Sequence, residues 1–383
     1  MKICTKRLPN ETKVLTPSKS GVHVHDSNDS KRTMIIVVLA LMPALLFGMY
    51  NVGYQRYLSI GQPPVFLTAF LYGFLALLPK IITSYAVGLG IEFASAQIRK
   101  HEIQEGFLVS GILIPMICPI ETPIWMIAVA TAFSVIFVKE VFGGTGMNIF
   151  NVALMTRAFL FFAYPSKMSG DDVFVANHSI CGLGNGTVVS SFSGATPLGQ
   201  IAINAGNSLH LTGITGGDIS LWDMFLGLIP GSVGETSTLF IILGGIVLLI
   251  SGVASWRIML SVFAGGLVMG FIAHSFPSET YPGSMLNPVE QICLGGFAFA
   301  AVFMATDPVT AAHTNTGKYI YGFLVGVMAI LIRVYNSGYP EGAMLAVLLM
   351  NAFAPLIDYC VVESNIRRRL RRAKQSNNYE QAK

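Results

Sequence analysis

Long apolar runs separated by short polar segments make up most of the chain. A helix that crosses a bilayer needs about 20 predominantly apolar residues, and ten runs approach or exceed that length. They lie near 34–51, 64–97, 107–120, 123–139 and 149–164 and, after a polar gap, near 238–254, 258–274, 289–305, 319–333 and 342–359. The pattern predicts an all-α polytopic membrane protein with about ten transmembrane helices.

The run at 64–97 is long enough for two helices, and Pro79 interrupts it. Positive residues collect on the cytoplasmic side of membrane proteins. If Lys31 is cytoplasmic, a single broken crossing keeps Arg99 and Lys139 on the same side, whereas two crossings would place them outside. We therefore predict one crossing here and both chain termini in the cytoplasm.

This topology divides the chain into five parts. They are a cytoplasmic arm at 1–33, a five-helix half at 34–164, an outer-face loop at 165–237, a second five-helix half at 238–360 and a basic cytoplasmic tail at 361–383. Two related halves with an odd number of spans would have opposite orientations, as in the inverted repeats of many transporters. Proline and glycine interrupt runs such as GFLVSGILIPMICPIETP, so we also expect broken helices that lie inside protein or beside a polar cavity.

The composition excludes several classes of function. Only 11% of the residues are charged and 53% are hydrophobic, against about 25% charged in soluble domains. The net charge of +4 comes largely from RRRLRRAK near the C-terminus, so it concerns membrane orientation and not nucleic acid. The five cysteines lack metal-ligand spacing. We assign no catalytic residue and no metal ligand.

Ionisable residues in or beside the apolar runs are candidates for an ion pathway. Asp307 lies in FMATDPVTAA, Asp358 in FAPLIDYC and Glu105 in HEIQEGF. A charged side chain at the centre of a bilayer costs roughly 2.5 to 3.5 kcal/mol on insertion scales. Such residues either serve an ion path or cap and flank helix ends. Arg157, deep in LMTRAFLFF, requires an anionic or carbonyl partner.

The polar loop contains the tetrapeptide Ser193-Gly194-Ala195-Thr196. Its small residues leave the threonine hydroxyl accessible to a modifying enzyme, and Pro197 is expected to lead the chain away in an extended conformation. A threonine hydroxyl can become a phosphoester. By itself, the tetrapeptide is equally typical of an ordinary turn.

Many separate motifs resemble the NqrB/RnfD family, which includes a membrane subunit of bacterial sodium-translocating NADH:quinone oxidoreductases. The resemblance covers about residues 22–372 and includes HVHDSNDSKRTMI, LFGMYNVG, HEIQEGF, KEVFGGTGMNIFN, RAFLFFAYP, SGAT, IPGSVGETSTL, ASWRI, LGGFAFAAVFMATDPV and YPEGAMLAVLLMNAFAPLID. It implies an FMN attached through its phosphate to Thr196, with Ser193, Gly194 and Ala195 completing the attachment motif. It also implies a separate flavin transferase that uses FAD, and a riboflavin held without a covalent bond among the spans.

By the same resemblance, Glu105, Asp307 and Asp358 match acids linked to sodium uptake and transport. The implied partners are the other subunits of a six-subunit complex in the bacterial inner membrane, ubiquinone, Na⁺ and lipid. The chain has no Rossmann fingerprint, no P-loop and no iron–sulfur cysteine set. NADH oxidation is therefore expected on another subunit.

The chain departs from the family pattern at two positions. Ser190 stands where an aspartate usually precedes the attachment motif, which bears on the efficiency of flavin attachment. Val152 replaces a proline after Asn151, a change expected to straighten the entrance of the following helix. Two alternatives remain: the D subunit of an Rnf-type ferredoxin:NAD oxidoreductase, and a channel or transporter for a small solute.

Overall fold

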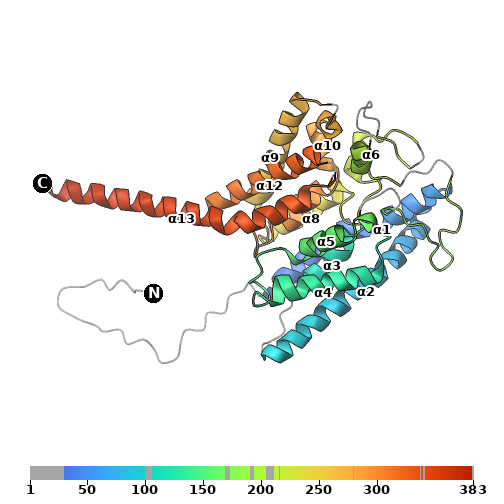
Figure 1. The fold of residues 1–383 in the computed structure, drawn as a ribbon, viewed down its shortest axis with the longest axis horizontal. Coiled ribbons are helices and arrows are strands. Elements are labelled where there is room, and N and C mark those ends of the chain that lie inside the picture. Colours follow the sequence, from blue (N-terminus) through green and yellow to red (C-terminus); the bar gives the residue numbers. More distant parts are fainter. Residues whose placement is uncertain are drawn as a thin grey trace.

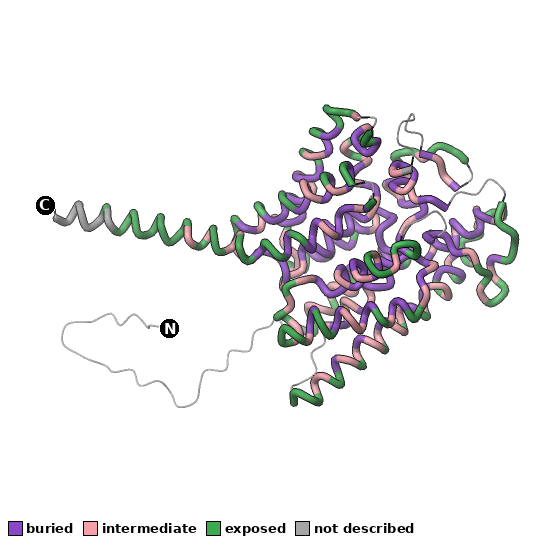
Figure 2. Tube along the Cα trace, in the orientation of Figure 1, coloured by how far each residue is buried: buried purple, intermediate pink, exposed green. Residues whose placement is uncertain are grey.

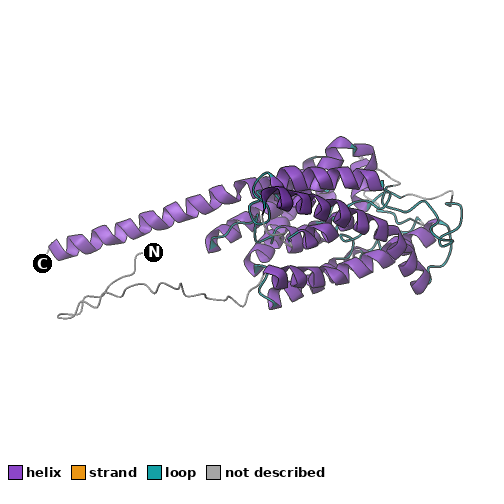
Figure 3. Cartoon of the chain, turned by 90° about the horizontal axis from the view of Figure 1, so that it is seen from below, coloured by secondary structure: helices purple, strands orange, loops and turns teal. Residues whose placement is uncertain are grey.

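The computed structural model is helical, with no β-strand among the residues that it describes (Figures 1 and 3). Those residues are 30–100, 106–168, 173–189, 194–203, 211–214, 216–278, 280–336, 338–339 and 341–381. The predicted all-α class is confirmed. Five helices are long and apolar enough to cross a membrane, which agrees with a multi-pass membrane protein.

Each predicted apolar run contains helix. In the first half these are α1 (Ser30–Ser59), α2 (Phe66–Arg99), α3 (Phe107–Ile117), α4 (Ile124–Ser134) with its π-helical continuation η1 (Val135–Glu140), and α5 (Val152–Ala163). In the second half they are α8 (Thr238–Ile250), α9 (Trp256–Ser275), α10 (Pro288–Cys293), α11 (Phe297–Phe299) with the π-helix η4 (Ala300–Met304), α12 (Asn315–Tyr335) and α13 (Ala343–Gln381). The short helices η2 (Pro165–Lys167), α6 (Pro197–Ile203), α7 (Leu221–Leu226) and η3 (Pro282–Met285) lie in connecting segments.

The run at 64–97 forms one helix, α2, as the charge argument predicts, and Pro79 lies inside it. At the other end of the chain, α13 passes the predicted boundary at 360/361 without a break and continues to Gln381. Figure 1 shows this helix projecting from the bundle, and Figure 2 shows exposed residues along its projecting part, where residues 364–373 are exposed. The basic tail is thus a continuation of the last helix.

Non-helical backbone lies inside the bundle at two places, and buried cations bind carbonyl groups there. Between α3 and α4, Lys80 of α2 donates hydrogen bonds to the carbonyl oxygens of Pro119, at 3.0 Å, and Ile120. Between α10 and α11, Arg333 of α12 donates to the carbonyl oxygen of Leu294 at 3.0 Å. Since lipid offers no hydrogen-bond donors, such partners are what permits irregular backbone at this depth.

The two halves contact each other through α1 with α8 and through α5 with α13, the first and the last helices of each half. If a two-fold axis relates the halves, each helix beside the axis contacts its own counterpart, here α1 with α8 and α5 with α13. Ten crossings and an inverted repeat remain predictions, since five helices reach spanning length and α3, α5 and α8 are shorter apolar helices.

Candidate functional site

Thr196 lies directly before α6, at the end of the bundle opposite to the projecting part of α13 (Figure 1). Its Oγ1 accepts a hydrogen bond from the backbone N–H of Gly199 at 3.1 Å, as in a helix cap. The expectation of an extended chain after the tetrapeptide is wrong, because Pro197 is the first residue of α6. Proline suits that position, where the missing N–H would have no helical partner.

The loop is also less open than its composition suggests. Gly194 and Ala195 are buried and Thr196 is half-buried. The predicted residue Ser193 and the departure at Ser190 lie outside the described residues. The hydroxyl of Thr196 therefore belongs to the wall of a pocket and not to a free loop.

This Thr196 pocket is a small cavity that is open to solvent. It is formed by α6, the segment before α8, the break between α10 and α11, and the segment before α13. The lining residues are Phe174, Thr196, Pro197, Leu198, Ile229, Pro230, Gly231, Ser232, Glu235, Thr236, Leu294, Gly295, Gly296 and Glu341.

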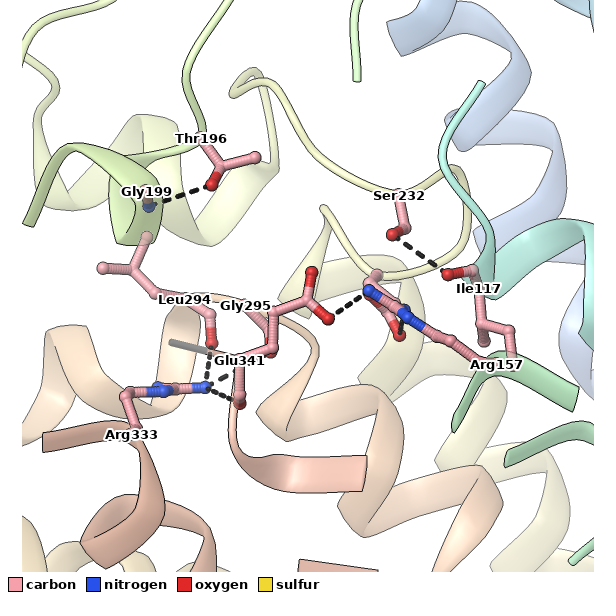
Figure 4. A network of polar contacts seen from close by, with 10 residues as sticks. Ile117, Arg157, Thr196, Gly199, Ser232, Leu294, Gly295, Arg333 and Glu341 are labelled. Atoms are coloured by element: carbon pink, nitrogen blue, oxygen red, sulfur yellow. Dashed lines mark hydrogen bonds and ion pairs between the residues drawn. The ribbon is translucent and has the colours of Figure 1, made fainter. Parts of the chain in front are cut away.

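A charge cluster of two arginines and two glutamates lies against the pocket. Arg157, only 1% exposed, donates from Nη1 to both carboxylate oxygens of Glu235 at 2.9 and 3.0 Å. Its Nη2 forms an ion pair with Glu341. Arg333 donates to the backbone oxygen of Glu341 at 3.4 Å. Figure 4 shows Glu341 between the two arginines, with Thr196 and Gly199 to one side.

The cluster confirms that Arg157 has anionic partners, but sequence reasoning did not find them. Glu235 and Glu341 lie 78 and 184 positions away along the chain, so no local pattern connects them to the arginine. The sequence did contain a feature that could have identified these two partners. Both glutamates lie next to a glycine in apolar surroundings, in GSVGETSTL and YPEGAML.

Thr236 adds an unsatisfied group to the same wall. The side chain is 4% exposed, and its Oγ1 has no hydrogen-bond partner among the described residues. A buried hydroxyl without a partner costs free energy, on the order of 1 to 3 kcal/mol.

A second, larger pocket, the Asp307 pocket, lies where α1, α3, α5 and η4 come together. It encloses about 840 Å³ of empty space. Its polar lining residues are Thr33, Ser110, Lys139, Thr145, Asn148, Asn151, Thr306 and Asp307. Lys139 is paired with Glu92 of α2 behind the pocket.

Asp307 accepts three hydrogen bonds in this pocket. The donors are the N–H of Val309 at 3.1 Å, the hydroxyl of Thr310 at 3.1 Å and the side-chain amide of Asn151 at 3.3 Å.

Asn151 also caps α5, since its Oδ1 accepts from the N–H of Ala153 at 3.0 Å. The expected straightening of this helix entrance stays a prediction. Val152 occupies the first position of α5, where proline and valine both fit because that N–H needs no helical partner.

Asp358 lies away from both pockets, on α13. Its carboxylate accepts from the N–H of His313 at 2.7 Å, and from the N–H and the hydroxyl of Thr314 at 3.0 and 2.5 Å. These contacts hold the start of α12, as a cap does. Glu105, the third predicted acid, lies outside the described residues. Thr196 and Asp307 thus lie in two separate pockets, whereas Asp358 lies outside both and binds the start of α12.

A helical bundle with five helices of spanning length and a polar pocket at each end defines a polytopic membrane protein with two candidate ligand sites. The family model described as NQR2, RnfD, RnfE matches residues 18–367, and the chain belongs to that family.

Similar proteins include the B subunits of the Na(+)-translocating NADH-quinone reductases of several bacteria. The protein of Chromohalobacter salexigens is 43% identical over 376 residues, which cover 93% of this chain and 87% of the relative. Those of Ectopseudomonas mendocina and Yersinia pestis are each 44% identical and cover 93% of this chain, with 90% and 89% of the relative matched.

Proposed function

We propose that the chain is the B-type membrane subunit of a sodium-translocating NADH-quinone reductase in the bacterial inner membrane. The observation that carries this is the similarity, over 93% of the chain, to relatives named as that subunit. NADH oxidation takes place on a partner subunit, because this chain has no nucleotide-binding fingerprint. Its own part is to relay electrons toward a quinone while Na⁺ is exported.

Thr196 is proposed to carry FMN as a phosphoester, with both termini of the chain cytoplasmic and the Thr196 pocket on the outer face. Attachment from FAD forms the bond between Thr196 Oγ1 and phosphorus and releases AMP. The two residues before it suit such an attachment, because Gly194 and Ala195 add no bulky side chain. When bound, the flavin supplies one-electron transfer between a two-electron donor and a quinone.

The Asp307 pocket is the proposed position of the second flavin, a riboflavin held without a covalent bond. It is the larger of the two pockets. Asn148 adds an amide group to the lining, and Thr145 has a buried hydroxyl without a partner in the described part of the chain. These groups match the polar edge of a flavin ring, while Val109, Leu113 and Phe303 supply apolar walls.

Glu105, Asp307 and Asp358 are proposed to serve the sodium path. Na⁺ prefers hard oxygen ligands, as other hard cations do. Asp307 has the stronger structural support, since its carboxylate lies in a pocket lined by further oxygen-bearing side chains. Asp358 must also hold the start of α12, so its replacement has a structural consequence as well.

The first test of the function is NADH:quinone reductase activity in membranes. We expect deletion of the chain to abolish the sodium-stimulated part of that activity, and the wild-type chain to restore it. The family also contains Rnf-type subunits. Restoration of ferredoxin:NAD activity instead, with no sodium-stimulated quinone reduction, would assign the chain to an Rnf complex. Facilitated movement of a small solute with neither redox activity would favour a transporter.

A further inference from the structure

An open groove lies between the start of α12 and α13, outside the two pockets described above. Its lining changes in character along α13. Leu356, Ile357 and Val361 come first, and Ser364 and Arg368 follow. The whole stretch covers about 18 Å of helix, at a rise of 1.5 Å per residue. An apolar stretch that ends in a hydroxyl and a guanidinium group fits an amphiphile with one charged end.

The change from apolar to polar lining lies at a membrane boundary. Trp256 and Tyr319 are exposed, and their ring centroids are 6.1 Å apart. Tryptophan and tyrosine gather where the hydrocarbon meets the head groups. Arg257 follows the first of these rings and Lys318 precedes the second. Since Tyr319 is next to Ile320 of the groove, the groove extends from the hydrocarbon into the layer of head groups.

The cation at the polar end is available to an anion. Arg368 has no hydrogen bond or ion pair within the described part of the chain, whereas Arg367 is paired with Glu363 at 3.0 Å. Arg371 and Arg372 follow by three and four positions, so they share its face of the helix. Basic pockets between membrane helices bind the head groups of anionic lipids. A zwitterionic head group would offer these arginines no net negative charge.

We propose that the groove between α12 and α13 binds an anionic phospholipid, with an acyl chain along Ile320 and Val361 and the phosphate at Arg368. In the proposed orientation of the chain, this lipid belongs to the cytoplasmic leaflet. The nearest acid on α13, Asp358, does not repel the phosphate from this site, because its carboxylate is bound to the N–H groups of His313 and Thr314.

The test is photo-crosslinking of the intact complex in detergent. The probe is a phosphatidylglycerol with a photoreactive group in one acyl chain, and mass spectrometry of peptides locates the adducts. We expect adducts in the peptides that contain Ile320 or Val361. Unlabelled phosphatidylglycerol should compete for this site, whereas phosphatidylcholine with the same chains should not.

Two arginine variants separate a built site from general attraction to the tail. Arg368→Gln should reduce the labelling about fivefold, which corresponds to about 1 kcal/mol for one basic residue at an anionic surface. Arg369→Gln is the matched control and should keep most of the labelling. It removes the same charge from the next residue, which does not line the groove. Both arginines are exposed, so neither variant should disturb folding.

Two results would overturn the proposal. Equal competition by phosphatidylglycerol and phosphatidylcholine, with labelling unchanged in Arg368→Gln, would show only the ordinary contact of lipid with a membrane helix. An absence of adducts on α12 and α13 would show that a partner subunit covers the groove. Thr196 lies at the opposite end of the bundle (Figure 1), so flavin fluorescence of the denatured chain should be the same in all variants, and either result would leave the proposed function standing.

Discussion

Arg157 connects three segments that are distant along the chain. Its guanidinium group binds Glu235, before α8, and Glu341, before α13, while the residue itself belongs to α5. Removal of one partner from a buried ion pair costs about 3 to 5 kcal/mol, because a buried charge is left uncompensated. Loss of Arg157 would leave the carboxylates of Glu235 and Glu341 without this cationic partner.

We therefore expect Arg157→Gln to reduce strongly the amount of folded chain in membranes and to lower the melting temperature of the solubilised complex. The matched control is Arg367→Gln. Arg367 forms a pair with Glu363 at 3.0 Å but is 70% exposed, and exposed pairs contribute between about 0 and 1 kcal/mol. Equal stability of the two variants would contradict the structural role of the charge cluster.

Asp307 and Asp358 differ in their surroundings, so their variants should differ as well. We expect Asp307→Asn to lower sodium-stimulated turnover while the flavin on Thr196 remains, because the two pockets share no lining residue. Asp358→Asn should lower turnover and also destabilise the start of α12 by about 1 kcal/mol, as the loss of a cap does. Sodium titrations of activity, with in-gel flavin fluorescence beside them, measure both effects. If neither variant alters the sodium dependence, both acids serve helix ends alone.

At the scale of elements, the close contact between α9 and α12 depends on small residues. A Cβ at Gly326 would lie 2.1 Å from the backbone oxygen of Val262, and one at Gly265 would lie 2.2 Å from that of Phe323. Small residues allow membrane helices to approach in this way. The two helices cannot keep their separation if either glycine gains a side chain.

Gly326→Ala is expected to destabilise the bundle by about 1 to 3 kcal/mol, the usual cost of overpacking. Gly90→Ala in α2 is the control, since a Cβ there would meet nothing within 4 Å. Thermal denaturation of the two solubilised variants gives the comparison. A loss of stability in Gly90→Ala as large as in Gly326→Ala would show that helix packing is not the cause.

The sequence predicted the apolar elements well and the irregular ones poorly. Length and hydropathy located a helix in every predicted run, and the distribution of positive charge correctly favoured a single α2. The helix at Pro197 was missed because α6 has seven residues, too few for a hydrophobic period to appear. The charge cluster depends on contacts between distant segments, which no local pattern records. The sequence also contained no sign of the π-helices η1 and η4.

At the scale of the whole molecule, the main prediction is the orientation of the chain in the membrane. Cys181 is exposed in the segment between the two halves, whereas Cys118 and Cys293 are buried. If this segment faces outward, a membrane-impermeant thiol reagent applied to sealed cells should label Cys181. Cys4 and Cys360 should become labelled only after the membrane is opened.

Cys181→Ser provides the control, since it should abolish the labelling of sealed cells. Labelling of Cys360 but not Cys181 under these conditions would reverse the orientation, and it would place Thr196 on the cytoplasmic side.

The central claim is that the hydroxyl of Thr196 carries a flavin. Mass spectrometry of the peptide that contains residues 193–199, isolated from the native complex, tests it most directly. We expect the mass of FMN, less one water, on Thr196, and an unmodified peptide in the Thr196→Ala variant. An unmodified wild-type peptide from cells that contain the flavin transferase would contradict the account.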